Sequence, residues 1–174
     1  LYELLKTAYA PGGARYFDAN FMAGVYEKPF EVIWADKPES IAEGREAASP
    51  MGRHMNGCRI GFDAGGSDRK VSAVIDGEAV FSKEVIWFPK INDNPDYHYQ
   101  GILSAMREAA EHMPRVDAIG VSSAGVYIDN RIMVASLFLK VPKNLFDLKV
   151  KDMYINVAKE IGDVPLVVAN DGDV

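Results

Sequence analysis

The 174-residue chain has very few of the side chains that build covalent or metal cross-links. Cys58 is its single cysteine, so no disulfide can form within the chain. The three histidines, His54, His98 and His112, lack the spacing of metal ligands, and a structural role is the simpler interpretation of all four residues. No run of about 18 apolar residues and no signal peptide is found, so we expect a cytoplasmic protein without a membrane span.

The chain also carries no excess of basic over acidic residues. The chain has 19 Lys and Arg against 25 Asp and Glu, a net charge of −6. This balance argues against general binding to nucleic acid or anionic membranes, because no basic field would offset phosphate repulsion. A bound nucleotide would have to be held by local N–H groups and a metal ion. With 48% apolar residues, the chain is long enough to bury one sizeable core.

A glycine pair follows an apolar strand pattern in residues 60–70, which read IGFDAGGSDRK. Gly65 and Gly66 lack a Cβ, so we expect positive φ angles and backbone N–H groups close to an anion. Ser67 adds a hydroxyl donor. Asp63, at the strand end, is suited to bind Mg²⁺ directly or through water beside a polyphosphate. The pattern predicts a phosphate-binding loop.

The residues after this loop predict a hairpin. Residues 70–76 and 78–88 are two β-rich runs, and they are joined at Asp76-Gly77, a pair that favours a type I′ turn. A P-loop or a dinucleotide fingerprint would instead lead directly into a helix. Neither of those motifs therefore applies.

Regular elements continue along the chain. Asn94-Pro95 predicts a helix start, and apolar residues at helical spacing predict about 18 helical residues before Pro114. Residues 116–121 predict a short buried strand that leads into a serine pair. Aromatic residues near the helix start are best explained by burial.

The last third of the chain predicts a second hairpin over 126–134, a helix over 150–161 and a strand over 164–169. The complete order is three strands, a helix, a strand, a connection, a helix and a strand. This is the ribonuclease H-like βββαβαβ order of an α/β fold. Its five-stranded sheet is mixed, because each later strand is reached by a helical crossover and is therefore parallel.

Residues 1–57 differ from the rest of the chain in their sequence pattern and are predicted to form an N-terminal extension to a domain over 58–174. Proline and glycine interrupt the extension, and short strands are expected at 21–26 and 30–35. Its 6 Lys and Arg against 8 Asp and Glu argue against a DNA-reading head. We expect it to pack on the main domain or on a partner.

Three stretches carry a resemblance to a known family: 61–67 (GFDAGGS), 119–125 (IGVSSAG) and 168–171 (VAND). They resemble, in this order, the first phosphate motif, the second sheet loop and the Asn-Asp catalytic corner of the ROK family, which contains repressors and sugar kinases. This family belongs to the superfamily of sugar kinases, heat-shock ATPases and actin. The resemblance covers 58–174 and implies an actin-like ATPase lobe.

The resemblance implies roles for the polar residues at these stretches. Asp171 is implied as the carboxylate that accepts a proton from a sugar hydroxyl, and Asn170 as a ligand of a neighbouring hydroxyl. Ser122 and Ser123 are implied as further substrate contacts. Each has a simpler reading, because Asn-Asp-Gly is also a common turn sequence and serines also line turns.

The resemblance also implies ATP and Mg²⁺ as cofactors. Mg²⁺ near Asp63 and the N–H groups of 65–67 neutralise the transferred phosphoryl group. Lys70 adds positive charge to this loop, or else lies on a solvated strand face.

Three functions remain open from the sequence. The first is ATP-dependent phosphorylation of a hexose or amino sugar. The others are a non-catalytic ROK-like sugar-sensing regulator and a superfamily ATPase that activates a partner enzyme. The chain opens on Leu1 and ends just after a strand, so we expect a piece of a longer polypeptide whose second lobe follows Val174. We expect this piece to be inactive alone, and a homodimer is left open.

Overall fold

A computed structural model describes residues 1–37, 39, 41 and 54–173. The chain divides into two compact units, Leu1–Met51 and Gly52–Val174. Within the described ranges, no helix is both long enough and apolar enough to cross a membrane.

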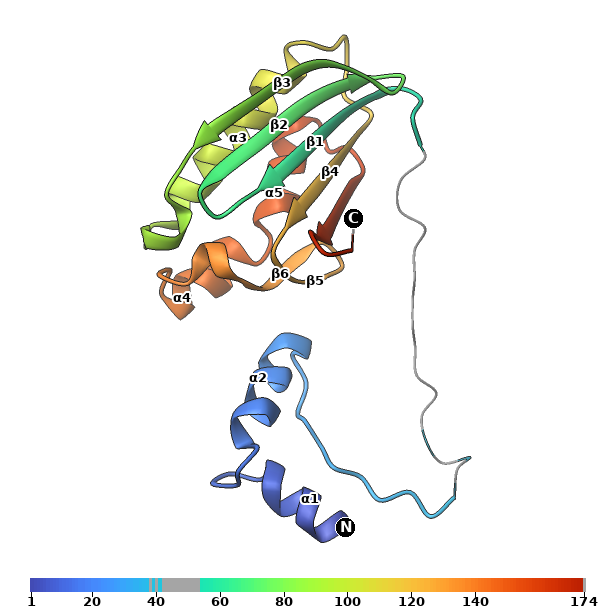
Figure 1. Ribbon diagram of the computed structural model, residues 1–174, viewed down its shortest axis with the longest axis vertical. Coiled ribbons are helices and arrows are strands. Elements are labelled where there is room, and N and C mark those ends of the chain that lie inside the picture. The colour runs from blue at the N-terminus through green and yellow to red at the C-terminus, as the bar shows by residue number, and fades with distance from the viewer. Residues whose placement is uncertain (38, 40, 42–53, 174) are drawn as a thin grey trace. The chain divides into compact units, whose positions relative to one another are not determined.

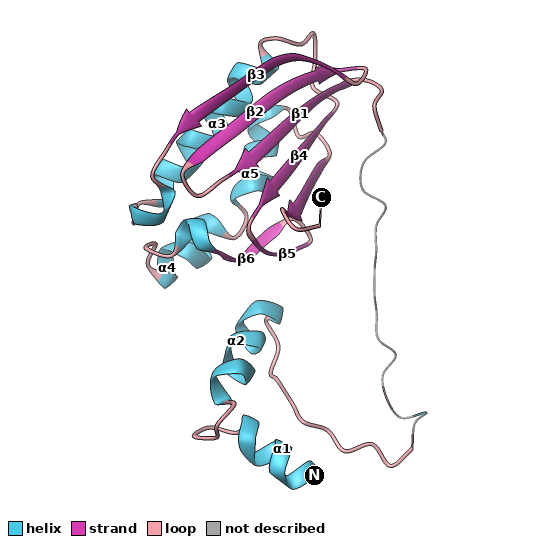
Figure 2. Ribbon diagram, viewed as in Figure 1, coloured by secondary structure: helices cyan, strands magenta, loops and turns pink. Residues whose placement is uncertain are grey.

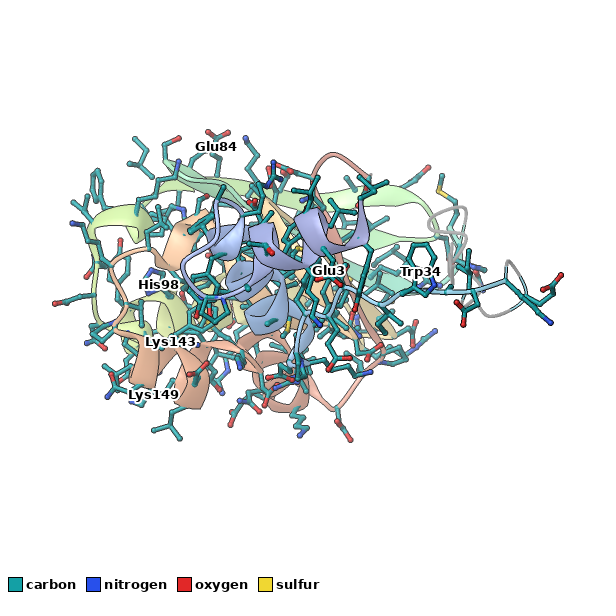
Figure 3. The ribbon with its side chains drawn as sticks, turned by 90° about the horizontal axis from the view of Figure 1, so that it is seen from below. Glu3, Trp34, Glu84, His98, Lys143 and Lys149 are labelled. Atoms are coloured by element: carbon teal, nitrogen blue, oxygen red, sulfur yellow. The ribbon has the colours of Figure 1, made fainter. Side chains whose placement is uncertain are left out.

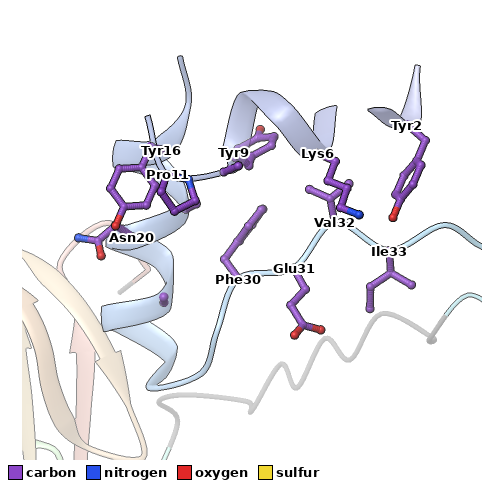
Figure 4. A pocket seen from close by; sticks show the side chains of 13 residues that line it. Tyr2, Lys6, Tyr9, Pro11, Tyr16, Asn20, Phe30, Glu31, Val32 and Ile33 are labelled. Atoms are coloured by element: carbon purple, nitrogen blue, oxygen red, sulfur yellow. The ribbon is translucent and has the colours of Figure 1, made fainter. Parts of the chain in front are cut away.

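The N-terminal unit contains two helices, α1 (Tyr2–Tyr9) and α2 (Tyr16–Tyr26). The strand expected at 21–26 was wrong, because these residues belong to α2. The strand expected at 30–35 was also wrong, since this segment is irregular. A pocket of about 490 Å³ lies within the unit, where the Phe30 ring approaches the Tyr9 ring to 4.9 Å between centroids (Figure 4).

The second unit is built on a mixed five-stranded sheet (Figures 1 and 2). Its strands are β1 Cys58–Ala64, β2 Asp68–Ile75, β3 Glu78–Ile86, β4 Ala118–Ser123 and β7 Leu166–Asn170. Their spatial order is β3-β2-β1-β4-β7. The first three strands are antiparallel neighbours, whereas β4 and β7 run parallel to β1. The predicted α/β fold and strand order are confirmed.

Both predicted hairpin turns are present. Asp76 and Gly77 have φ angles of 50° and 88°, as a type I′ turn between β2 and β3 requires. Asp129 and Asn130 have φ angles of 52° and 63° between β5 (Gly125–Ile128) and β6 (Arg131–Ala135). This second hairpin forms a separate two-stranded sheet below the main one.

Two long helices cover one face of the main sheet, behind the strands in Figure 1. Helix α3 (Pro95–Ala110) begins as predicted, because the Asn94 side chain accepts a hydrogen bond of 2.9 Å from the Asp96 N–H. It has 16 residues and ends slightly earlier than expected. Helix α5 (Met153–Ile161) begins after the predicted start, because Phe146–Val150 forms a π-helical turn that follows the short helix α4 (Lys143–Leu145).

The core lies between the sheet and these helices. Alternate residues of β1 are buried, which places Ile60, Phe62 and Ala64 on the helix face and Asp63 on the opposite face. Ile102 of α3 and Val157 of α5 are fully buried against this layer. Burial of this kind is the main favourable contribution to folding.

Candidate functional site

The ends of four strands meet at one edge of the sheet. Because β1, β3, β4 and β7 run in the same direction, the segments that follow them lie at this carboxyl edge (Figure 2). Ala64, Ser123 and Asn170 form one row across β1, β4 and β7. The predicted phosphate loop and the Asn170-Asp171 corner therefore lie at the same edge, with one strand between them.

Trp87, the residue directly after β3, holds the predicted phosphate loop in place. The Trp87 indole N–H donates to the Gly65 carbonyl oxygen at 2.8 Å, and the Trp87 backbone N–H donates to the Ser67 carbonyl oxygen at 3.0 Å. The Trp87 side chain is only 1% exposed, so the expectation of aromatic burial is confirmed there. The loop is thus supported from behind by the end of a neighbouring strand.

The conformation expected at the glycine pair was wrong. Among the described residues, positive φ angles occur at four other glycines but not at Gly65 or Gly66. Glycine is instead needed at these two positions because neighbouring atoms leave no room for a Cβ. A Cβ on Gly65 would lie 2.6 Å from the carbonyl oxygen of Asp68, and one on Gly66 would lie 2.5 Å from the Lys90 Nζ.

Polar side chains beside the loop form a small network around Asp68. Its carboxylate accepts the Ser67 hydroxyl at 2.8 Å and pairs with the Lys70 Nζ at 2.9 Å. Lys70, and then Ser67, lower the pKa of Asp68, while Asp68 raises the pKa of Lys70. Both predicted phosphate-binding side chains are therefore engaged with Asp68 in this structure.

Asp63 lies on the face of the sheet opposite to α3 and α5, which we call the open face. In the strand pairing it lies opposite Lys70 on β2 and Ser122 on β4. Within the described ranges, no group of three or more His, Cys, Asp or Glu gathers to hold a metal ion by itself. Mg²⁺ commonly uses one or two carboxylates and takes its other ligands from water and phosphate. A single carboxylate beside the predicted phosphate loop fits that mode of binding.

The two serines at the end of β4 face opposite sides of the sheet. Ser123 is 1% exposed, and its hydroxyl donates to the Ala64 carbonyl oxygen at 3.2 Å on the helix side. Ser122 is half-buried on the open face, the face that carries Asp63. Of the two, only Ser122 faces the open side.

Asn170 shapes the turn that carries Asp171. Its side-chain amide donates to the Gly125 carbonyl oxygen at 2.6 Å and accepts from the Gly172 N–H at 2.8 Å. The Asp171 N–H donates to the Ser123 carbonyl oxygen at 3.3 Å. The Asp171 side chain is exposed, and within residues 54–173 its carboxylate has no ion pair or hydrogen bond. The turn thus presents a free carboxylate at the edge.

Two tyrosines that the sequence did not single out lie behind this turn. The hydroxyls of Tyr127 and Tyr154 are buried, and neither has a hydrogen-bond partner among the described residues. Burial raises the pKa of Tyr127 to about 12, with a smaller opposing effect of Ser123 and a further increase from Asp171. Burial also raises the pKa of Tyr154.

These phenols predict a loss of stability in alkaline solution. Unfolded tyrosines ionise near pH 10, whereas the folded unit holds both protons more tightly. The resulting stability is complete below about pH 10 and is lost as the pH rises toward 12. We expect Tyr127→Phe to reduce the slope of the urea midpoint against pH above pH 10. Tyr26→Phe, at an exposed ring, should keep the original slope, and equal slopes in both variants would contradict the prediction.

The described lobe is similar in structure to sugar kinases. A candidate sugar kinase from Cytophaga hutchinsonii matches with a TM-score of 0.50 and 17% identity, covering 66% of this chain and 36% of that protein. The inorganic polyphosphate/ATP-glucomannokinase from Arthrobacter sp. strain KM matches with a TM-score of 0.50 and 22% identity, covering 68% and 46%. A ROK-family transcriptional regulator, a homologue of the E. coli MLC protein, matches with a TM-score of 0.43 and 14% identity, covering 67% and 28%.

At these identities the likeness concerns the fold. The lobe shares its fold with the matching part of these two sugar kinases, as the resemblance to the ROK family predicted. The chain spans less than half the length of each of these proteins. No protein-family model and no curated protein sequence matches the chain.

Proposed function

We propose that this lobe binds the phosphates of ATP in a kinase that transfers a phosphoryl group to a sugar hydroxyl. One observation carries the proposal: the Gly65–Ser67 loop and the Asp171 carboxylate lie at one edge of the sheet, separated by the end of β4. A donor phosphate on the loop and an acceptor hydroxyl at Asp171 would then share that edge.

In the proposed reaction Asp171 orients the acceptor hydroxyl and takes its proton. A carboxylate is a weak base toward an alcohol, so the proton moves late, as the sugar oxygen bonds to phosphorus and the bond to the ADP oxygen breaks. Asn170 holds the turn through Gly125 and Gly172, so its first role is to position Asp171, and its remaining amide hydrogen can reach a neighbouring hydroxyl.

The remaining side chains contact either the phosphoryl donor or the sugar that accepts the phosphoryl group. Backbone N–H groups of the Gly65–Ser67 loop bind phosphate oxygens, and Ser67 and Lys70 contribute when a phosphate competes with Asp68 for them. Ser122 contacts the sugar from the open face, and Ser123 supports the floor of the site from below. Mg²⁺ held at Asp63 would supply charge neutralisation for the phosphates.

We also propose that a second lobe of the same polypeptide holds the adenosine, since the structurally similar proteins are more than twice as long as the matched region. Such an enzyme would work in the cytoplasm, where ATP is available.

Assay of ADP release tests the function. The intact protein is mixed with Mg-ATP and a panel of hexoses and amino sugars, and we expect ADP formation that depends on one sugar class. Sugar binding in isothermal titration without ADP release would refute the kinase and favour a sugar-sensing regulator. ATP hydrolysis without any sugar dependence would refute it in favour of an ATPase that activates a partner.

A further inference from the structure

A lysine that the sequence patterns did not single out lies against the glycine pair. Lys90 belongs to the 3₁₀ turn η2 (Pro89–Ile91), which follows β3 at the carboxyl edge. Its Nζ is so close to Gly66 that a Cβ on this glycine would lie 2.5 Å from it. The missing Cβ of Gly66 therefore makes room for an ammonium group beside the loop backbone.

The main chain that carries Lys90 is held firmly. The Pro89 carbonyl oxygen accepts the Asn92 N–H at 3.2 Å and lies 3.0 Å from the His98 Nε2. His98 is fully buried and is seen within the lobe in Figure 3, whereas Glu84 points outward from it. Lys90 thus projects from a fixed turn.

The two residues before this turn are hydrogen-bonded to the loop and to α3. Trp87, three residues before Lys90, donates its indole N–H to Gly65 and its backbone N–H to Ser67. The Phe88 N–H donates to the Tyr97 hydroxyl oxygen at 2.9 Å, which ties the segment to α3. The position of Lys90 relative to the loop is therefore set by hydrogen bonds and not by chance proximity of two surfaces.

The side chains beside the loop include two carboxylates and a lysine that is already paired. Asp63 and Asp68 place two carboxylates near it, and Lys70 already pairs with Asp68 at 2.9 Å. Within the part of the chain that the structure describes, the Lys90 ammonium has no ion pair or hydrogen bond. Lys90 is thus an uncommitted positive charge at the glycine pair.

We propose that Lys90 is the cation that binds the terminal phosphates of the phosphoryl donor at the Gly65–Ser67 loop, which rests on the proposed function of that loop. An ammonium group is a compact charge with three donors, suited to phosphate oxygens. Charge on the leaving oxygen increases during transfer, so the same contact is strengthened in the transition state. The recognised chemistry is a chain of phosphates, as in ATP or inorganic polyphosphate.

Binding measurements on the intact protein test this assignment. We expect Lys90→Met to weaken tripolyphosphate and Mg-ATP binding about tenfold or more in isothermal titration, as for a lost charge-assisted hydrogen bond. Lys90→Arg should retain much of the affinity. Lys159→Met is the matched control, because Lys159 is exposed on α5, away from the carboxyl edge. If Lys90→Met weakened the binding of Mg-ATP but not that of tripolyphosphate, the donor recognised would be the nucleoside triphosphate.

Chemical labelling gives a second measurement that requires no variant. Acetylation of lysines followed by mass spectrometry should show Lys90 protected by tripolyphosphate and Lys159 unprotected. Unchanged affinity in Lys90→Met, or equal labelling of Lys90 with and without tripolyphosphate, would overturn the assignment.

The two proposals fail in different ways. Polyphosphate binding that depends on Lys90, without sugar-dependent ADP release, refutes the kinase and leaves the Lys90 assignment standing. Sugar-dependent ADP release that Lys90→Met leaves unchanged refutes Lys90 alone. Absence of binding of both tripolyphosphate and Mg-ATP by the intact protein overturns both.

Discussion

Replacing Asp171 by asparagine should lower the turnover of the intact protein by about 10² to 10⁴, the usual contribution of a general base. Nucleotide affinity should change little, because the proposed phosphate loop lies on the other side of β4. Asparagine has nearly the shape of aspartate but cannot accept the proton. The measurement is sugar-dependent ADP release at saturating substrates, together with titration of Mg-ATP.

The physical reason lies in the turn that carries this carboxylate. Asn170 uses both ends of its amide within the chain, to Gly125 and Gly172, and the Asp171 N–H bonds to the Ser123 carbonyl oxygen. None of these bonds uses the Asp171 side chain, so the variant should retain the turn. The loss of rate then reports on the carboxylate and not on the fold.

Asp173→Asn is the matched control, since Asp173 is an exposed aspartate in the same turn that bonds Asn170 through its backbone N–H. This variant should keep its turnover. Equal turnover in Asp171→Asn and the wild type would remove Asp171 from the role of base.

The second large effect is expected at the glycine pair, where Gly65→Ala should weaken ATP binding by roughly 10²-fold, the cost of misplacing binding groups by about 1 Å. The added Cβ would lie 2.6 Å from the Asp68 carbonyl oxygen. This oxygen belongs to the first residue of β2, which pairs with Ile86 of β3. The backbone must shift to relieve the contact, and the loop N–H groups shift with it.

Two other alanine substitutions separate this effect from a general loss of stability. In Gly66→Ala the Cβ meets the flexible end of Lys90, so that side chain can move, and we expect a smaller loss of affinity. In Gly120→Ala no atom lies within 4 Å of the Cβ, so binding should be unchanged. ATP titration and urea midpoints of the three variants provide the comparison. ATP affinity in Gly65→Ala equal to that in Gly120→Ala would contradict the steric argument.

The sequence was most informative where structure follows from neighbouring residues. Strand alternation around Ile60, the turn pairs Asp76-Gly77 and Asp129-Asn130, and the Asn94 cap are all local features, and the structure contains each of them. Local patterns failed in the N-terminal unit, where residues 21–26 (FMAGVY) read as a strand but belong to helix α2. The pattern there is ambiguous because a short apolar run fits a buried strand and a buried helix equally well.

The sequence by itself determined the α/β fold and the position of the glycine loop after β1, because alternation, turn pairs and helix caps act over a few residues. Only the tertiary structure decided how the site is assembled. The Trp87 indole reaches Gly65 across 22 positions of sequence, and Lys90 meets Gly66 because parallel strands bring their ends to one edge. It also decided that both glycines are needed for space and not for positive φ, since the atoms that a Cβ would meet come from later in the chain.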